Sequence, residues 1–239
     1  MEDLLETTIK AHGGLEQWSG VRSIAVSFNY YGGLLELKGY PGHRKPTVWI
    51  DTTQPRAVIQ HLEPGDDRWI FTPGRVWIER PDGFIVEERF EPRSAFAGHN
   101  RTTPWDRLHL TYFLGYAMWN YLTTPFLFTW PGFTVRELEP HVENRQTWRV
   151  LEVIYPDNIP AHTGQQRLYF DETGMLKRLD YVTDVLGGVG AHYCYDPKTF
   201  GGIVVPTLRR VVRPTPEGIN LSGPTSFVLD YSDVVIDRA

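Results

Sequence analysis

The sequence predicts a mainly β (α+β) fold, a single curved antiparallel sheet that forms a half-barrel around an apolar cavity. Two observations predict it. Short segments of alternating polar and apolar residues, separated by tight turns, fill most of the 239 residues. One aromatic, helix-like segment interrupts them near the middle of the chain. A β-meander of this length normally curls, so we expect this helix to plug the open mouth or the concave face.

A short amphipathic helix is predicted before the sheet. Apolar residues recur at helical spacing over residues 4–12, and Gly13 and Gly14 end the run as a C-terminal cap does. From Val21 onwards apolar residues take every second position, as in Ile24, Val26 and Phe28, which indicates a strand with one buried face. The chain therefore changes from helix to strand near residue 20.

The remaining strands are expected on both sides of the central helix. Those before it are residues 34–40, 47–50, 57–61, 68–71, 76–79 and 84–90. Those after it are residues 133–139, 147–155, 165–170, 176–185, 191–195, 203–212 and 226–236. No shift in composition marks a linker, so residues 1–239 are predicted to form one domain.

The central helix is predicted to be largely buried. Pro104 stands where a helix can begin, and apolar side chains cover all sides of residues 105–121. Pro125 ends the helix, and residues 126–130 are expected to make a second apolar crossing.

Composition excludes several classes of function. The formal net charge of −5, without a basic run, argues against nucleic-acid binding. Cys194 is the single cysteine, so an intrachain disulfide is impossible. Residues 1–10 contain no apolar stretch typical of a secretory signal, and no segment is apolar enough for a membrane span. We therefore expect a cytoplasmic protein.

No strong catalytic or cofactor signature is present. The sequence contains no nucleophile elbow, zinc helix or phosphate-binding loop, so neither a cofactor nor a metal is predicted. Residues 187–190 contain three glycines, but Tyr193 stands where a dinucleotide-binding loop needs its last glycine. A hairpin turn is the expected structure there.

Aromatic side chains are the predicted ligand contacts. Tyr and Trp combine an apolar surface with a polar group, which suits apolar but oxygenated molecules. The alternative is that these side chains fill the half-barrel completely. The expected ligand-binding residues are Trp105, Tyr112, Tyr116, Trp119, Phe126, Phe128, Trp130 and Tyr193.

Two pairs of residues are candidates for acid–base chemistry. His109 follows Asp106 by three positions on the central helix, so an oriented imidazole could act as a general base if that face lines the cavity. Asp184 could lie across from His192 in an antiparallel pair. The alternatives are a surface histidine beside a helix N-terminus and a pair on the wet outer face.

Three segments carry a family resemblance. The first runs from Ala11-His12-Gly13-Gly14 through Trp18 to residues 21–24, and the second is the hairpin of residues 168–178. The third combines Phe200-Gly201-Gly202 and Val205-Pro206-Thr207 with a last strand at 228–237. Together they resemble the LolA/LppX superfamily of bacterial lipoprotein carriers. The resemblance implies a half-barrel of about eleven strands, helices on its concave side and a ligand between them.

Two functions are compatible with these features. The first is a soluble carrier of a small hydrophobic molecule such as a lipid, a polyketide or a terpenoid-like compound. The alternative is a cofactor-independent enzyme of secondary metabolism, an isomerase, cyclase, dehydratase or hydrolase that uses His, Asp and Tyr in the same cavity. The resemblance implies the second function as well, since some cytoplasmic relatives of such half-barrels look like cofactor-free enzymes of secondary metabolism.

Overall fold

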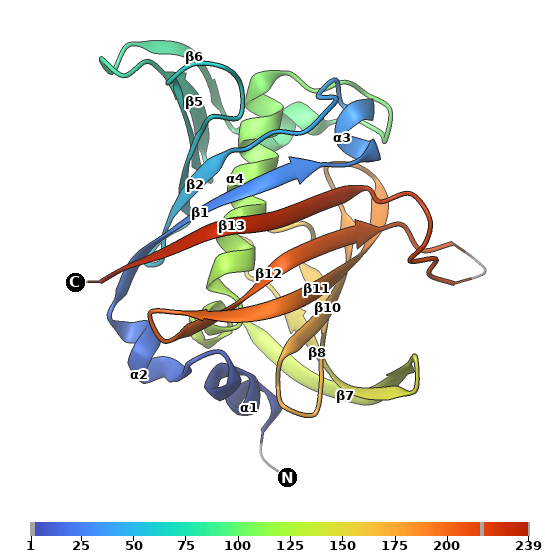
Figure 1. The fold of residues 1–239 in the computed structure, drawn as a ribbon. Coiled ribbons are helices and arrows are strands. Elements are labelled where there is room, and N and C mark those ends of the chain that lie inside the picture. Colours follow the sequence, from blue (N-terminus) through green and yellow to red (C-terminus); the bar gives the residue numbers. More distant parts are fainter. Residues whose placement is uncertain (1–2, 216–217, 239) are drawn as a thin grey trace.

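In the computed structural model of the chain, thirteen strands form one antiparallel sheet that curves around a long helix (Figure 1). The structure describes residues 3–215 and 218–238. Positions 1–2, 216–217 and 239 of the expected domain lie outside the described residues. The strands before the long helix are β1 (Val21–Tyr31), β2 (Thr47–Asp51), β3 (Arg56–Gln60), β4 (Arg68–Thr72), β5 (Arg75–Glu79) and β6 (Ile85–Phe90). Those after it are β7 (Thr134–Glu143), β8 (Gln146–Ile154), β9 (Gln165–Phe170), β10 (Leu176–Thr183), β11 (Gly188–Phe200), β12 (Ile203–Val212) and β13 (Phe227–Arg238).

The sheet has two wings that meet at the two ends of the chain. Its strand order is β6-β5-β4-β3-β2-β1-β13-β12-β11-β10-β9-β8-β7. β1 pairs with β13 over most of their length, from Val21 opposite Arg238 to Tyr31 opposite Val228. From this central pair, one meander runs outward to β6 and the other to β7, and these two strands are the edges. The predicted half-barrel is therefore confirmed, with thirteen strands where the resemblance implies about eleven.

The long helix α4 (Arg107–Thr123) lies on the concave face, as expected. Asp106 caps its N-terminus by accepting a hydrogen bond from the backbone N–H of His109, at 2.8 Å. Residues 108–123 are all buried, which explains why apolar side chains occur on every side of the helix. The helix packs against the first wing, β2 to β5. At the closest approach a Cβ on Gly115 would lie 2.3 Å from the Cβ of Phe71.

Shorter helices close the end of the half-barrel near the C-terminus of α4. These are α1 (Leu4–Ala11), α2 (Gly14–Ser19) and the 3-10 helix η2 (Phe126–Thr129). Trp18 of α2 stacks on Phe126 with ring centroids 4.2 Å apart. The chain thus turns at Gly13, which has φ of 120°, and continues as a second helix, whereas the sequence predicted only one. Residues 126–130 form η2 and its end, a single short turn.

One predicted strand is a helix. Residues 34–40 contain α3 (Gly33–Leu37), and both Leu34 and Leu35 are buried. Adjacent buried positions do not fit a strand with one buried face. Tertiary contacts fix the helix, because the buried Lys38 ammonium that follows it donates hydrogen bonds to the carbonyl oxygens of Asn100 and Thr103 at 2.7 and 2.9 Å.

A second, smaller apolar cluster lies on the outer face of the second wing. It contains Trp148, Val150, Tyr169, Ala191, Tyr193 and Val212. Their sequence neighbours Leu151, Leu168 and Phe170 belong to the main core on the concave side. Strands β8 to β12 are therefore buried on both faces over part of their length.

The Gly115 contact generates a stability prediction. We expect Gly115→Ala to lower the free energy of unfolding by about 1–3 kcal/mol, because the added methyl group must push α4 away from Phe71. Alanine has a higher helix propensity than glycine, which by itself would raise the free energy of unfolding. We expect the packing cost to be larger, so that the net change is a loss of stability. Urea denaturation measures the change. Gly164→Ala is the control, since a Cβ there meets nothing within 4 Å, and an equal effect of both substitutions would contradict the interpretation.

Candidate functional site

A cavity of about 270 Å³ lies between α4 and the second wing of the sheet. It exists because α4 packs closely against the first wing and leaves space on its other side. Phe113 of α4, Tyr181 of β10, Val211 of β12 and Phe227 of β13 line its interior. A narrow space of about 10 Å³ shares Phe113, Val211 and Phe227 with it and reaches Ala117, Tyr121 and Leu229.

The turn between β10 and β11 forms part of the cavity mouth. Leu186, Gly187, Gly188, Val189 and Gly190 all line it. The glycine-rich segment is thus a hairpin turn, as expected, and it does not precede a helix. Val189 is 52% exposed, so the entrance offers apolar surface to solvent.

A buried network of aromatic hydroxyls and imidazoles forms the wall behind Tyr181. The ring nitrogens of His162 lie 2.9 Å from the Tyr116 hydroxyl and 2.7 Å from the Tyr121 hydroxyl. Tyr181 stacks on the His162 ring at 4.1 Å, and its hydroxyl is 3.4 Å from that of Tyr121. Burial lowers the pKa of His162 to about 3, so this imidazole is neutral at pH 7. One of its nitrogens then donates to a tyrosine and the other accepts from one.

His192 continues the network from the next strand. Its Nδ1 lies 3.4 Å from the Tyr181 hydroxyl, and its Nε2 has no protein partner. Burial, with the Arg209 charge as the second cause, lowers its pKa well below the usual value. A neutral imidazole in contact with a tyrosine that lines the cavity can accept a hydrogen bond from it and orient its hydroxyl.

Arg209 lies on β12 beneath this wall and is 1% exposed. Its guanidinium donates to Cys194 Sγ at 3.3 Å and to the carbonyl oxygen of Tyr121 at 3.2 Å, and it lies over the Tyr121 ring. The structure gives it no carboxylate partner among the described residues. Burial is the main cause of the low pKa of His12 and of His192, and the charge of Arg209 lowers both further.

A second hollow of about 440 Å³ opens on the other side of α4. Arg93 spans it by donating to Asp184 at 2.8 Å and to the carbonyl oxygen of Ala161 at 3.0 Å. Tyr112 and Tyr155 also line it, together with Glu91 and Asp157. This hollow is more polar than the first, and it lies between the first wing and the segment that follows β8.

The predicted ligand-binding residues do not line the 270 Å³ cavity. Tyr112 lines the polar hollow, and Tyr116 belongs to the hydroxyl network. Trp105 packs on Phe96 and Phe113, whereas the indole N–H of Trp119 donates to the carbonyl oxygen of Asp51. Phe126, Phe128 and Trp130 fill the closed end around η2. Tyr193 lies on the outer face of the sheet, away from the concave side.

The first predicted acid–base pair is present but serves as a helix cap. His109 Nδ1 lies 2.7 Å from Asp106 Oδ1, and its Nε2 lies 3.2 Å from the carbonyl oxygen of Ala95. Asp106 also accepts from Arg89 at 2.6 Å. Burial alone would raise the pKa of Asp106, but hydrogen bonds from His109 and Arg89 lower it well below the usual value. Neither residue of the pair lines a described hollow. His109 lies beside the helix N-terminus, as in the alternative, but it is buried and not a surface histidine.

The second predicted pair is not formed. His192 lies opposite Leu179 in the register, and its side chain faces the concave core. Asp184 follows the end of β10, forms an ion pair with Arg93 and is half exposed. The expected pairing of Asp184 with His192 is wrong because the β10–β11 turn places Asp184 beyond the last paired residues, Thr183 and Gly188. Among the described residues no group of three possible ligands is placed to hold a metal ion.

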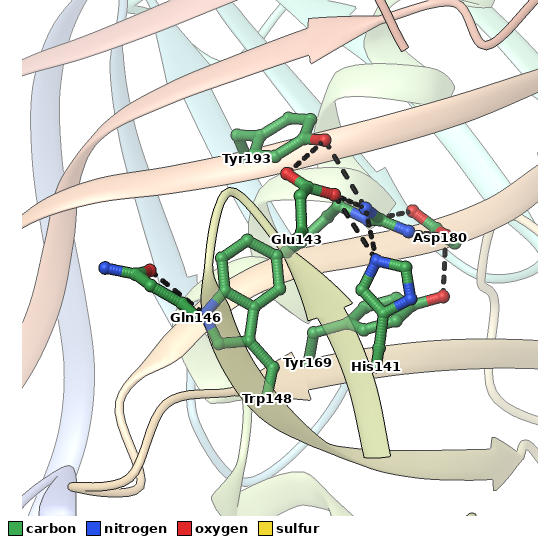
Figure 2. Close-up of polar contacts among 8 residues, drawn as sticks. His141, Glu143, Gln146, Trp148, Tyr169, Asp180 and Tyr193 are labelled. Carbon is green, nitrogen blue, oxygen red and sulfur yellow. Dashed lines mark hydrogen bonds and ion pairs between the residues drawn. The ribbon is translucent and has the colours of Figure 1, made fainter. Parts of the chain in front are cut away.

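A cluster of polar and charged side chains lies on the outer face of the second wing (Figure 2). Arg178 of β10 forms two hydrogen bonds with Asp180, at 2.8 and 2.7 Å, and an ion pair with Glu143 from the β7–β8 hairpin. Glu143 also accepts from the Tyr193 hydroxyl at 2.9 Å, and Asp180 accepts from Tyr169 at 2.8 Å. Each carboxylate therefore already has its partners. These hydrogen bonds and ion pairs hold the β7–β8 hairpin over the outer apolar cluster, so the polar side chains have a structural role.

Sequence reasoning missed Tyr181, His162 and Val211 as parts of the site. The alternation in residues 203–212 already places Val211 on the same face as Arg209, but only the sheet register brings that face to Phe113 of α4. His162 stands in an irregular segment without a periodic signal. Its contacts with Tyr116 and Tyr121 are set by the tertiary fold.

The low pKa of His162 predicts a dependence of stability on pH. Between about pH 3 and 6.5 the unfolded chain binds a proton at this position that the folded protein does not bind. The free energy of unfolding therefore falls as the pH falls through this window, by about 1.4 kcal/mol per pH unit for this group. His162→Gln should reduce that slope by about one proton in urea unfolding at several pH values. The exposed His43 is the control, and an unchanged slope in H162Q would refute the assignment.

Comparison with known proteins places the fold. No family model and no curated protein matches the sequence. A LolA superfamily protein from Nitrosomonas europaea matches the structure with a TM-score of 0.55 at 12% identity, over 99% of this chain and 93% of that one. A domain assigned as an outer membrane lipoprotein-sorting protein, from Vibrio parahaemolyticus, gives 0.56 at 10% identity, over 98% and 92%. A DUF1329 family protein from Desulfovibrio piger gives 0.55 at 12% identity, over 98% and 92%. The chain therefore has the LolA/LppX-like fold that three of its segments suggested.

Proposed function

We propose that the protein binds a small hydrophobic molecule in the cavity between α4 and the second wing of the sheet, and that it acts as a binding protein or carrier. The observation that carries this proposal is the cavity itself, about 270 Å³ of space whose interior is lined by Phe113, Val211 and Phe227. Burial of apolar surface drives such binding. The Tyr181 hydroxyl supplies one polar contact, which suits an oxygenated molecule such as a lipid, a polyketide or a terpenoid-like compound.

The structural relatives support the same function. One of them is assigned as a lipoprotein-sorting protein, and its fold matches over nearly the whole of this chain. A shared fold does not fix a shared ligand, so the support is for the use of the concave face and not for lipoprotein as cargo. No helix among the described residues is long and apolar enough to span a membrane. The cytoplasmic location and the place in secondary metabolism stay predictions.

Binding of an uncharged probe tests the proposal. We expect decan-1-ol to bind with one-to-one stoichiometry in isothermal titration calorimetry. Val211→Phe should weaken this binding by about tenfold, because the larger ring occupies space that the ligand needs. Native mass spectrometry of protein from its own host, followed by extraction, would then identify the natural ligand.

The adjacent residue provides a matched control. Val212 has the same size and lies on the same strand, but it belongs to the outer apolar cluster. Val212→Phe should therefore perturb stability in a similar way while leaving decan-1-ol binding unchanged. Equal binding by the wild type and V211F, with both folded in thermal melting, would show that the probe does not enter this cavity.

One contact favours a second candidate function, proton transfer on the bound molecule. Tyr181 lines the cavity, and its hydroxyl is 3.4 Å from the neutral His192. A tyrosine with a histidine behind it can move a proton to or from an oxygenated ligand. Incubation of the extracted ligand with the protein in D₂O tests this. Deuterium incorporation that Tyr181→Phe abolishes would support it, and no incorporation would leave the protein as a carrier.

A further inference from the structure

The entrance of the cavity has a charge opposite to that of the whole chain. The formal net charge is −5, yet the residues that line the cavity include Arg101, Arg213 and His99 and no Asp or Glu. The hollow on the other side of α4 differs, since Glu91, Asp157 and Asp184 line it with Arg93. The two openings thus differ in the charged side chains that line them.

Neither arginine at the entrance has a carboxylate partner among the residues that the structure describes. Nine of the other seventeen arginines do have one within the described part of the chain, among them Arg89, Arg93 and Arg178. Arg101 and Arg213 are close enough to repel each other, and burial together with this repulsion lowers the pKa of Arg101. Two cations that line the same opening without a carboxylate partner favour the binding of an anion.

A third cation adds to the same field. Lys38 is buried beneath the 99–103 segment and donates to the carbonyl oxygens of Asn100 and Thr103. Burial and the nearby Arg101 lower its pKa to about 8. The pKa of His99 is also lowered, by burial, by His109 and by Lys38. The cationic side chains are therefore Lys38 and Arg101, at the segment before α4, and Arg213, at the end of β12, whereas His99 is uncharged at pH 7.

Strand β12 and the residue that follows it place a charged side chain next to the apolar wall of the cavity. Arg209, Val211 and Arg213 alternate along the strand, and Val211 and Arg213 line the same cavity. Val211 also borders the narrow inner space, whereas Arg213 follows the end of the strand at the entrance. A molecule with its apolar part against Phe113 and Phe227 would therefore hold its other end near Arg213 and Arg101.

The size of the cavity limits the apolar part. At about 270 Å³ it lies just below the range of about 300–1,000 Å³ that is typical of small-molecule pockets. A single chain or one small ring system fits such a volume, whereas a lipid with several acyl chains does not. The inner space of about 10 Å³ gives little room for extension.

Resting on the function proposed above, we propose that the ligand is a single-chain amphiphile with a carboxylate headgroup, of the fatty-acid class. The apolar chain lies between α4 and strands β10 to β13. Arg101 and Arg213 bind the carboxylate at the entrance through charge-assisted hydrogen bonds, and Lys38 contributes to the field. The headgroup and not the chain then distinguishes the ligand from uncharged apolar molecules of the same length.

Three probes of equal chain length test the headgroup. Isothermal titration calorimetry at pH 7.5 compares decanoate, decan-1-ol and decyltrimethylammonium, each below its micelle concentration. We expect the wild type to bind decanoate at least tenfold more tightly than decan-1-ol and to bind the cation most weakly. A rise in salt concentration should weaken decanoate binding and leave decan-1-ol binding unchanged, because salt screens exposed charges.

Two double variants, each of which removes two positive charges, test whether Arg101 and Arg213 cause the preference for decanoate. R101Q/R213Q should lose the tenfold preference for decanoate and its salt dependence while it still binds decan-1-ol. R22Q/R56Q removes two exposed arginines that do not line the cavity and should behave as the wild type. Both variants change surface or partly exposed side chains, and thermal melting checks that they fold.

The possible outcomes distinguish recognition of the carboxylate headgroup from binding in the cavity. Equal affinity for decanoate and decan-1-ol, or an unchanged preference in R101Q/R213Q, would overturn the carboxylate assignment while the binding function stands. If R22Q/R56Q also lost the preference for decanoate, the preference would depend on the net charge of the protein, and the role of Arg101 and Arg213 would be overturned. Binding of none of the three probes would overturn the proposed function and this inference with it.

Discussion

The pairing of β1 with β13 is the contact on which the rest of the structure depends. It joins the first and last strands of the chain, so that Ile24 lies opposite Ile236 and Val26 opposite Val234. Without it the chain would form two separate meanders, each with an additional open edge. The concave surface that receives α4 is made by both wings, and it exists only when this long-range pair has closed. The entropy of closing so large a loop is offset by the buried apolar residues that the two strands share.

The position of α4 decides where the cavity lies. The absence of a side chain at Gly115 lets the helix approach Phe71 of the first wing closely. The helix therefore lies nearer to β2–β5 than to the second wing. The space on the far side is partly filled by aromatic rings, such as Phe113 on Phe227 with centroids 5.4 Å apart, and the remainder is the cavity. A close contact on one side of a helix thus creates a binding space on the other.

The second wing carries polar groups on a wall that is otherwise apolar. His162, Tyr116, Tyr121 and Tyr181 satisfy one another, so their burial costs less than that of isolated hydroxyls and imidazoles. His192 Nε2 and Arg209 Nε are buried without a protein partner. Such groups occur where a structure retains polarity for a reason other than stability. The linked Tyr116, Tyr121, His162 and Tyr181 side chains lie on the side of α4 that faces the cavity.

The sequence by itself determined the class of the fold and the position of most of its elements. Alternation with a period of two identified the strands, because most of them have at least one buried face, although the edge strands β6 and β7 contain no buried residue. All-round apolarity identified α4 as buried. The sequence could not show that residues 34–40 contain a helix, since that depends on Lys38 reaching the 100–103 segment. It also could not place the site. Aromatic residues were visible on α4, but most of them pack against the first wing or the closed end, and Tyr193 faces outward. The residues that line the cavity come from α4, β10, β12 and β13, and only the strand register and the helix position bring them together, because both are fixed by contacts between residues far apart in the chain.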